Sequence, residues 1–374
     1  MSKPTTRGRR VRRVIARLAT VVVLLLMTGC LVAYWRSTNE CADVKRGRPV
    51  DGMQAIIYCD YGSPEMLELE TLEKPVPGDS QVLVRVRAAA VNPLDWHYMR
   101  GTPYLMRLDA GLRKPKVIQL GVDFAGTVES VGRAVTQFAP GDEVFGARTG
   151  ALAQYVTARE DLIVAKPRNI SFEQAAAVPV AGLTALQALR DHGKVGPGQK
   201  VLINGASGGV GTFAVQIAKA LGAEVTGVCS SRNVELVRSI GADHVIDYTN
   251  EDFTGRDERY DVIIDNVGNH SLSDLRGVLT PTGTYVMVGG PSGRWLDPLP
   301  RVLGLVVTSW FVDQEMRFFI SRLDPRDLTL LRQMIEAGQL TPVIDRRYSL
   351  AEAAKAVEYL ETGRARGKVV IAIE

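Results

Sequence analysis

The segment Val201-Leu202-Ile203-Asn204-Gly205-Ala206-Ser207-Gly208-Gly209-Val210-Gly211 joins an apolar run to a loop of small residues. A helix is expected to open at Gly208–Thr212 and to point the apolar side chains that follow into a core. In a strand–loop–helix turn of this kind, free N–H groups and the positive end of the helix dipole hold a pyrophosphate close to the backbone. The segment therefore predicts a dinucleotide site and redox chemistry by hydride transfer.

Glycine strings also occur in ordinary tight turns, so the surroundings of this loop decide its meaning. Read as G-x-G-x-x-G, the loop has Ala206 at the first position, followed by Gly208 and Gly211. A second helix is expected at Asn233–Ile240. The strands expected around these helices are Glu224–Val228, Asp243–Asp247, Tyr260–Asp265 and Thr284–Gly289. This alternation predicts an α/β fold with a doubly wound parallel sheet.

The end of the second strand indicates which dinucleotide is bound. The chain there reads Gly227-Val228-Cys229-Ser230-Ser231-Arg232-Asn233 and lacks the acid that would favour NAD by binding a ribose 2′-hydroxyl. Ser230 and Ser231 can donate hydrogen bonds, and Arg232 can pair with a 2′-phosphate. We therefore predict NADPH; the alternative is that Arg232 is a solvated residue of the first helical turn.

Length and charge limit the function classes. The 374 residues suffice for two domains, and 46% hydrophobic with 23% charged residues is ordinary for a globular enzyme. Residues 1–52 hold eleven Lys and Arg against three Asp and Glu, so the remainder of the chain is net acidic. No nucleic-acid-binding surface is therefore expected in the body of the protein, the chain after residue 52.

The cysteines and histidines give no metal pattern. The four cysteines at 30, 41, 59 and 229 are not spaced as a zinc knuckle or a redox pair, and the four histidines at 97, 192, 244 and 270 do not cluster. Cys59 is expected to fill a strand. A disulfide framework is not expected, which suits a reducing compartment.

The N-terminal 52 residues predict a membrane anchor. One Lys and six Arg in residues 1–17 precede the uncharged, mostly apolar run from Leu18 to Trp35. As a helix, this run would span about 27 Å, close to the thickness of a bilayer core. A cleaved signal peptide, a lipoprotein site at the lipobox-like Met27-Thr28-Gly29-Cys30 and a buried soluble helix are the alternatives.

The side of the membrane on which the body lies stays open. The basic N-terminus is expected in the cytoplasm, with the body outside, yet NADPH is a cytoplasmic reagent. An inverted anchor would resolve this conflict. So would a true start at Met53, which would make the protein cytoplasmic.

The region after Met53 reads as short β segments with glycine and proline corners, a barrel-like pattern. Strand-like runs occur at Gln54–Tyr58, Leu67–Glu70 and Gln81–Ala88. Two further segments of this kind are Gly121–Gly132 and Phe138–Gly146.

At this point the chain resembles the medium-chain dehydrogenase/reductase superfamily, in its zinc-free quinone oxidoreductase (zeta-crystallin-like) branch. The matching segments are Gln81–Asn92, Gly121–Gly146, Ala175–Leu189, Val201–Gly222, Gly241–Tyr248, Tyr260–Gly268 and Gly367–Ile373. The resemblance implies a GroES-like catalytic domain, a Rossmann domain and a C-terminal segment that returns to the first domain. Zinc-dependent members have Cys near Asn92 and Gly-His-Glu at Gly121-Val122-Asp123, so we predict no metal.

The resemblance also implies the site residues. Asn92 would line the nicotinamide pocket, and His97 stands where quinone reductases have a substrate-pocket tyrosine, so Tyr98 and Tyr104 are alternative proton donors. Asp95 is expected to be a structural residue of a turn or a cap. The implied cofactor contacts are Thr184, Ala206, Ser207, Gly208, Gly209, Val210, Gly211, Ser230, Ser231, Arg232, Tyr248, Asn266, Val267, Gly268 and Lys368.

The apolar stretch Val302–Phe311 is too short to cross a membrane. It could edge a substrate pocket or cover a partner surface, although such a stretch more often lies in a core.

These expectations combine into a membrane-anchored, zinc-independent, NADPH-dependent reductase of hydrophobic quinones or α,β-unsaturated carbonyls. The alternative is a weakly catalytic or non-catalytic NADPH-binding protein at the membrane. Family precedent implies a homodimer. The domains are predicted as 1–52 (basic N-terminus with an anchor at about 18–35), 53–178 (GroES-like), 179–315 (Rossmann) and 316–374 (C-terminal return).

Overall fold

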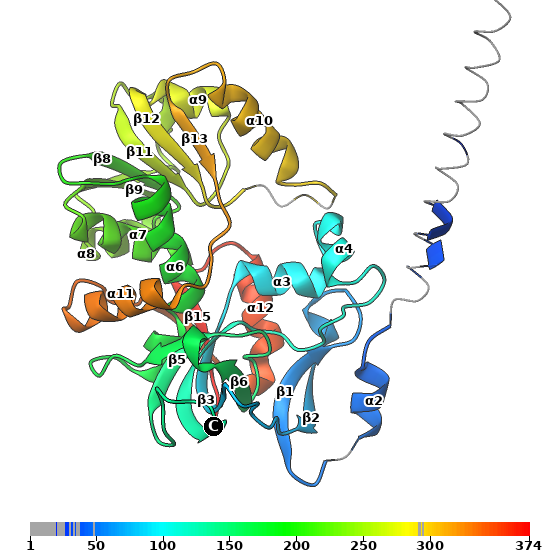
Figure 1. The fold of residues 1–374 in the computed structure, drawn as a ribbon. Coiled ribbons are helices and arrows are strands. Elements are labelled where there is room, and N and C mark those ends of the chain that lie inside the picture. Colours follow the sequence, from blue (N-terminus) through cyan, green and yellow to red (C-terminus); the bar gives the residue numbers. More distant parts are fainter. Residues whose placement is uncertain are drawn as a thin grey trace, which may run out of the picture.

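The computed structural model describes residues 38–47, 49–290 and 295–374, together with Thr20, Met27–Gly29, Leu31, Val32, Tyr34 and Gly293. Two large sheets organise these residues, one above the other in Figure 1. The chain crosses from the lower sheet to the upper one and returns to the lower sheet at its end. Residues from both ends of the chain therefore meet in one domain.

The upper sheet is a doubly wound parallel sheet. Its order along the sheet is β10 (His244–Asp247), β9 (Glu224–Cys229), β8 (Lys200–Asn204), β11 (Tyr260–Asp265), β12 (Leu279–Met287) and β13 (Glu315–Phe318). Numbered by their place in this domain, the strands run 3-2-1-4-5-6, the order of a Rossmann domain. The order reverses between β8 and β11, where such folds bind their ligands.

Helices cover both faces of this sheet. They are α6 (Pro179–Gln187), α7 (Gly209–Ala220), α8 (Val234–Ser239), α9 (Leu272–Gly277), α10 (Leu299–Ser309) and α11 (Pro325–Glu336). A continuous core joins buried residues of β8, α6, α7 and α11, including Ile203, Leu186, Phe213 and Leu331. The central strands β8, β9 and β11 are largely apolar because both of their faces are buried, whereas the edge strands β10 and β13 carry exposed and charged residues.

The lower sheet has seven strands. Six follow one another in the order β14 (Ile344–Ser349), β15 (Lys368–Ala372), β3 (Gln81–Val91), β4 (Asp123–Val131), β5 (Glu143–Ala147) and β7 (Ile163–Ala165), and β6 (Tyr155–Arg159) also pairs with β3. The C-terminal strand β15 pairs antiparallel with β3, and Val369 lies opposite Val91. This register brings the start of β15 beside the end of β3. Helices α5 (Phe172–Ala176) and α12 (Ala353–Glu361) pack against this sheet, and α3 (Pro93–Arg100) packs against α12.

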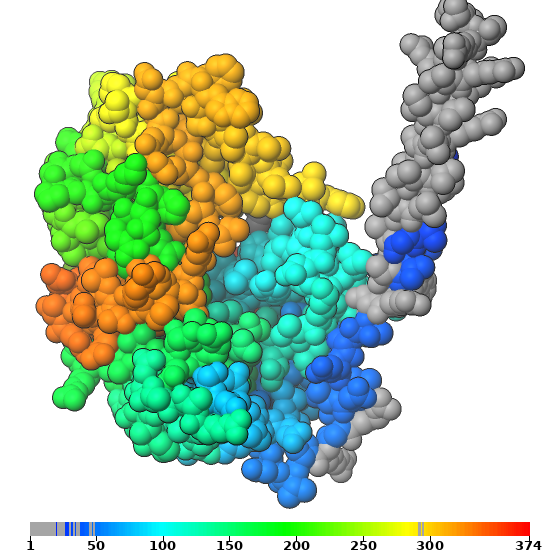
Figure 2. Space-filling view, in the orientation of Figure 1, coloured from blue at the N-terminus to red at the C-terminus, as the bar shows by residue number. Residues whose placement is uncertain are grey.

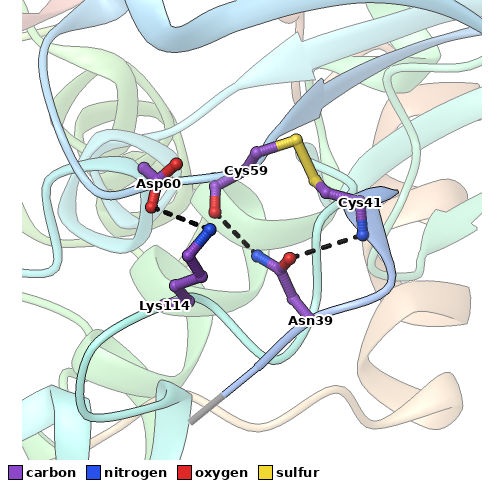
Figure 3. The surroundings of a disulfide bond; sticks show 5 residues. All are labelled: Asn39, Cys41, Cys59, Asp60 and Lys114. Atoms are coloured by element: carbon purple, nitrogen blue, oxygen red, sulfur yellow. Dashed lines mark hydrogen bonds and ion pairs between the residues drawn. A yellow bond between two sulfur atoms is a disulfide. The ribbon is translucent and has the colours of Figure 1, made fainter. Parts of the chain in front are cut away.

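A two-stranded hairpin of β1 (Gly52–Tyr58) and β2 (Leu67–Glu73) extends the lower domain, and the short helix α2 (Cys41–Arg46) lies beside it (Figure 1). A disulfide joins Cys41 to Cys59, with their Cα atoms 5.6 Å apart. Figure 3 shows Asn39 beside the bond, donating from Nδ2 to the Cys59 carbonyl at 2.7 Å. Cys41 packs in one apolar cluster with Met53 and Ala55.

The sequence predicted that Cys59 fills a strand and that no disulfide forms. The Cys41–Cys59 bond shows that both predictions were wrong. The two cysteines stand 18 residues apart in no recognised pattern, and the packing of the start of α2 against β1 brings them together. Cys229 is a free, buried cysteine, and burial raises the pKa of its thiol to about 11.

The predicted anchor at about residues 18–35 falls largely outside the described residues. Within the described part of the chain, no helix has both the length and the apolarity to cross a membrane.

The apolar stretch Val302–Phe311 forms most of α10, and expecting it in the core was largely wrong. Leu305 is buried, but a stripe of large apolar side chains on the same helix is exposed. Figure 2 shows the golden segment of residues near 300 on the surface, at the upper right of the view. The stripe consists of Leu299, Leu303, Val306, Val307 and Trp310, which share one helix face at spacings of three and four residues.

Candidate active site

The glycine loop lies between β8 and α7 as the sequence predicts. Gly205 has a φ of +77°, which favours glycine, and Gly208 is the N-cap residue of α7. A Cβ on Gly211 would stand 2.1 Å from the Gly205 carbonyl oxygen, so only glycine allows this approach of helix and loop. The loop is fixed to β9, because the N–H groups of Gly205 and Ala206 both donate to the Val228 carbonyl, at 3.2 and 3.0 Å. The first turn of α7 thus presents backbone N–H groups for an anion.

Two buried amide oxygens near this sheet edge lack a partner in the structure. They are Oδ1 of Asn233 and Oδ1 of Asn266. Asn233 follows β9 and donates from Nδ2 to the Ser207 hydroxyl at 2.9 Å, while Asn266 follows β11. Buried polar atoms are normally satisfied, so partnerless acceptors beside a helix N-terminus fit a polar ligand. The residues present therefore fit a dinucleotide.

The residues that would read the adenosine end lie together after β9 and β10. Ser231 donates its hydroxyl to Asp247 Oδ2 at 2.5 Å, and the exposed Arg232 donates to the Arg364 carbonyl at 2.7 Å. Arg366 in turn donates to the Arg232 carbonyl at 3.3 Å. Arg232 is thus linked to a segment more than 130 residues away, through the Arg364 carbonyl and the Arg366 side chain, and the Asp247 carboxylate lies beside Ser231. Tyr248 lies exposed nearby, and its N–H donates to the Cys229 carbonyl at 3.0 Å.

The loop Asn266–Val267–Gly268 is held by the carboxylate at the end of β11. Asp265 Oδ1 accepts from the N–H groups of Val267 and Gly268, at 3.1 and 2.8 Å. Its Oδ2 accepts from the Tyr285 hydroxyl at 2.8 Å, and Arg301 of α10 donates to that hydroxyl at 2.9 Å. A network built from three elements therefore fixes this loop beside the glycine loop.

The candidate nicotinamide end involves α6 and the lower domain. Thr184 of α6 donates its hydroxyl to the Val180 carbonyl at 2.7 Å and lies 3.0 Å from the Ser321 hydroxyl. The backbone N–H of Val180 donates to Asp123 Oδ1 at 3.0 Å, which links this helix to β4.

Asn92, Asp123 and Lys368 form a buried polar cluster at the junction of the two domains. Asn92 donates from Nδ2 to Asp123 Oδ2 at 3.0 Å, and Lys368 donates to Asn92 Oδ1 at 2.5 Å. Lys368 Nζ also lies 3.3 Å from Asp123 Oδ2. Burial raises the pKa of the Asp123 carboxyl, and the neighbouring Lys368 ammonium opposes this rise.

Asp95 confirms the expectation of a capping residue and is buried in addition. Its Oδ2 accepts from the Asn92 N–H at 2.7 Å and closes a capping box at the start of α3. Burial raises the pKa of this carboxyl to about 7, while the hydrogen bond from the Asn92 backbone works in the opposite direction.

The three candidate proton donors lie on α3 and the segment after it. His97 Nδ1 is 2.7 Å from the Thr102 carbonyl oxygen, and burial lowers the pKa of the ring, so the imidazole is neutral at pH 7 and donates this Nδ1–H. Tyr98 is half-buried on the same helix. The Tyr104 ring packs edge-on against Trp295 at 4.9 Å between centroids, which brings it beside the segment that leads into α10.

The structure thus groups the predicted cofactor residues between Ala206 and Gly268 at the carboxyl edge of the upper sheet. Thr184 lies on α6, and Lys368 lies in the lower sheet beside Asn92. Sequence reasoning missed the roles of Asn233, Asp247, Arg301 and the partner of Lys368, Asp123. Asp247 is the last residue of the predicted strand Asp243–Asp247, and Asn233 is the first residue of the helix predicted after the second strand, a placement that could have been used as a signal. Arg301 and Asp123 gave no such signal because their partners are distant in sequence. No group of three metal-ligating side chains occurs among the described residues.

Comparisons with known proteins agree with this arrangement. Residues 78–168 match the model of the alcohol dehydrogenase GroES-like domain, and residues 240–371 match that of the zinc-binding dehydrogenase domain. The chain is 36% identical over 334 residues to the 2-methylene-furan-3-one reductase of Solanum lycopersicum, a match that covers 85% of this chain and 79% of that protein.

Solved structures show the same fold. The quinone oxidoreductase of Coxiella burnetii has a TM-score of 0.75 at 32% identity, over 87% of this chain and all of its own. The Escherichia coli quinone oxidoreductase, solved in complex with NADPH, has a TM-score of 0.74 at 26% identity, over 85% of this chain and 99% of its own.

A Rossmann domain with an anion-binding glycine loop, joined to a GroES-like domain, defines a two-domain dehydrogenase or reductase. The chain belongs to the medium-chain dehydrogenase/reductase superfamily, in its zinc-free, quinone-oxidoreductase-like branch. It is an oxidoreductase.

Proposed function

We propose that this chain is an NADPH-dependent reductase of quinones and α,β-unsaturated carbonyl compounds that works without zinc. The observation that carries the proposal is the open N-terminus of α7 beside the partnerless Asn233 and Asn266 oxygens. The names of the relatives support the substrate class, since they include a quinone oxidoreductase and a reductase of 2-methylene-furan-3-one. The complex of the Escherichia coli relative supports the choice of NADPH.

Bound NADPH would supply the hydride. The residues of this chain would bind the cofactor, orient the nicotinamide and donate a proton to the substrate. The N–H groups at the start of α7 bind the pyrophosphate, and Arg232 binds the 2′-phosphate. The loop after Asp265 and the Thr184 hydroxyl flank the nicotinamide. The negative charge that develops on the substrate oxygen then needs a hydrogen-bond donor and a proton.

The geometry favours a tyrosine over His97 as the proton donor. The neutral His97 ring directs its Nδ1–H to the Thr102 carbonyl, which leaves Nε2 as an acceptor. Tyr98 and Tyr104 can each donate a hydroxyl proton. Comparing Tyr98→Phe with Tyr104→Phe identifies the donor as the variant whose turnover falls while its NADPH affinity is kept.

The test of the proposed function is NADPH oxidation by the purified chain against a panel of quinones, enals and enones. Turnover of at least one member is expected, with NADPH preferred over NADH. No turnover of any member would overturn the reductase proposal. NADPH binding without turnover would favour the alternative, a weakly catalytic or non-catalytic NADPH-binding protein. Substitutions of Asn92 and Thr184 separate the two, because they lower turnover only in an enzyme.

We also propose that the chain forms a homodimer through the upper domain. β13 is the last strand of the upper sheet, and the exposed stripe of α10 lies next to it. Contiguous exposed apolar patches are a mark of interaction sites. A second copy related by a two-fold axis would cover the stripe with the same stripe, as isologous interfaces require.

We propose in addition that residues 18–35 anchor the chain in a membrane, with the body on the side opposite to the basic N-terminus. The Cys41–Cys59 disulfide supports this side, because disulfides persist in oxidising compartments. A start at Met53 would remove Cys41 from the apolar cluster that it shares with Met53 and Ala55. That contact argues against the alternative of a cytoplasmic protein that begins at Met53.

Protease treatment of intact cells tests the side of the membrane and shows which pool of NADPH can reach the site. Digestion of the body in intact cells is expected. Digestion only after lysis would place the body in the cytoplasm.

A further inference from the structure

A fully buried ion pair lies where the lower sheet meets the upper domain. Lys368 is the first residue of β15 and Asp123 the first of β4, and their side chains are 3% and 0% exposed. Burying two charges costs desolvation free energy that an apolar pair of the same size would not cost. The contacts that Lys368 and Asp123 make therefore indicate the role of the pair.

The pair fixes the orientation of the Asn92 amide. Lys368 donates to Asn92 Oδ1, and Asn92 Nδ2 donates to Asp123 Oδ2. The second N–H of the amide faces the Ala90 carbonyl at 3.4 Å. A flipped amide would set its NH₂ group against the ammonium and its oxygen against the carboxylate, so the two charges permit one orientation only.

The same pair contacts the first turns of two helices of the upper domain. Asp123 Oδ1 accepts from the Val180 N–H at the start of α6, the helix that carries Thr184. The stem of Lys368 passes over the start of α7, where a Cβ on Gly209 would meet Lys368 Cδ at 3.3 Å. One ion pair thus contacts the Asn92 side chain, the start of α6 and the start of α7 after the glycine loop.

We propose that Lys368 and Asp123 are positioning residues for hydride transfer, which hold the glycine loop, α6 and the Asn92 amide in one geometry. This inference rests on the proposed reductase function. It assigns to Lys368 a task besides contact with the cofactor, and it gives Asp123 a role. The charges themselves are required, since an uncharged pair of similar size would fill the space without holding the amide in this orientation.

The experiment compares Lys368→Met, Asp123→Asn and the double variant in the full chain. Three quantities are measured: the melting temperature, the dissociation constant of NADPH, and the single-turnover rate of hydride transfer with 4-deuterated NADPH as a check on the chemical step. Each single variant leaves one buried charge without its partner, so both should melt at lower temperature. The double variant should recover most of the melting temperature while hydride transfer stays at least about tenfold slow.

Matched variants complete the design. The Lys219→Met/Asp243→Asn double variant removes an ion pair of 2.7 Å that lies half-exposed within the upper domain, and it should leave hydride transfer unchanged. Asn92→Ala keeps both charges and should reproduce the slow transfer. If the single variants do not fold, the double variant and Asn92→Ala still decide.

The outcomes separate this inference from the proposed function. Recovery of hydride transfer together with the melting temperature in the double variant would reduce the pair to a structural role and overturn the inference. Absence of turnover in the unmodified chain would overturn the proposed function instead. In that case the emission of bound NADPH still reports the nicotinamide environment, and the inference expects the double variant to change it.

Discussion

Arg232 is the residue on which we expect the preference for NADPH to depend most directly. It lies exposed beyond β9, where Arg364 and Arg366 approach it. Replacement by alanine should lower the ratio of kcat/KM for NADPH to that for NADH by about 10- to 100-fold, since a charge-assisted hydrogen bond is lost. Arg238→Ala, an exposed residue of α8 paired with Glu235, is the matched control. An unchanged ratio in Arg232→Ala would remove this residue from the site.

Gly211 is the glycine of the loop that tolerates substitution least. A methyl group there would lie 2.1 Å from the Gly205 oxygen, so Gly211→Ala must displace the loop or the helix. The variant should lose several kcal/mol of stability and bind NADPH poorly. Gly255→Ala is the control, because a Cβ there meets nothing within 4 Å. Thermal melts and NADPH titrations that treat both variants alike would contradict this account of the loop.

Asp95 should give the chain a pH-dependent stability. Its pKa is raised by burial from 3.8 to about 7, so the folded chain holds this proton more tightly than the unfolded chain. The stabilisation is present below about pH 4 and is lost as the pH rises to about 7. The free energy of unfolding of Asp95→Asn minus that of the unmodified chain should therefore rise across this range, by at most about 4 kcal/mol. Denaturant titrations at pH 4, 5.5 and 7 measure it; a difference that does not vary with pH would contradict the prediction.

At the scale of elements, α2 and the first hairpin depend on the Cys41–Cys59 bond. The bond closes a loop of about 18 residues, which in the chain-entropy model contributes about 3 kcal/mol. A reductant should lower the melting temperature of the unmodified chain and leave that of the Cys41→Ser/Cys59→Ser variant unchanged. Equal sensitivity of both proteins would show that the reductant acts elsewhere.

The elements also show where sequence patterns are informative. The strand Tyr260–Asp265 has the predicted bounds, and the start of α7 differs by one residue, because a buried parallel strand and a glycine turn are local features. The strand predicted at Thr284–Gly289 instead spans Leu279–Met287 as β12. It ends early because the N–H groups of Val288 and Gly289 turn to the Asp265 carbonyl of the neighbouring strand.

At the scale of the whole molecule, the exposed stripe of α10 should hold two copies together. Leu303, 62% exposed near the middle of the stripe, is the residue to change. Leu303→Asp should convert a dimer to a monomer, because a carboxylate would be buried without a partner. Val76→Asp, at a loop position that is 85% exposed, is the control. Sedimentation that finds a monomer in the unmodified chain, or a dimer in Leu303→Asp, would overturn the proposed interface.

The amino-acid sequence by itself determined the class of fold, the place of the dinucleotide loop and the absence of the zinc ligands of related enzymes. These features are local, because consecutive residues determine a strand, a glycine turn and a helix start. Tertiary structure alone decided that Cys41 bonds to Cys59, that Lys368 pairs with Asp123, and that one apolar face of α10 is exposed. The partners in each pair stand 18 and 245 residues apart, and no local pattern encodes which distant side chain fills a buried position.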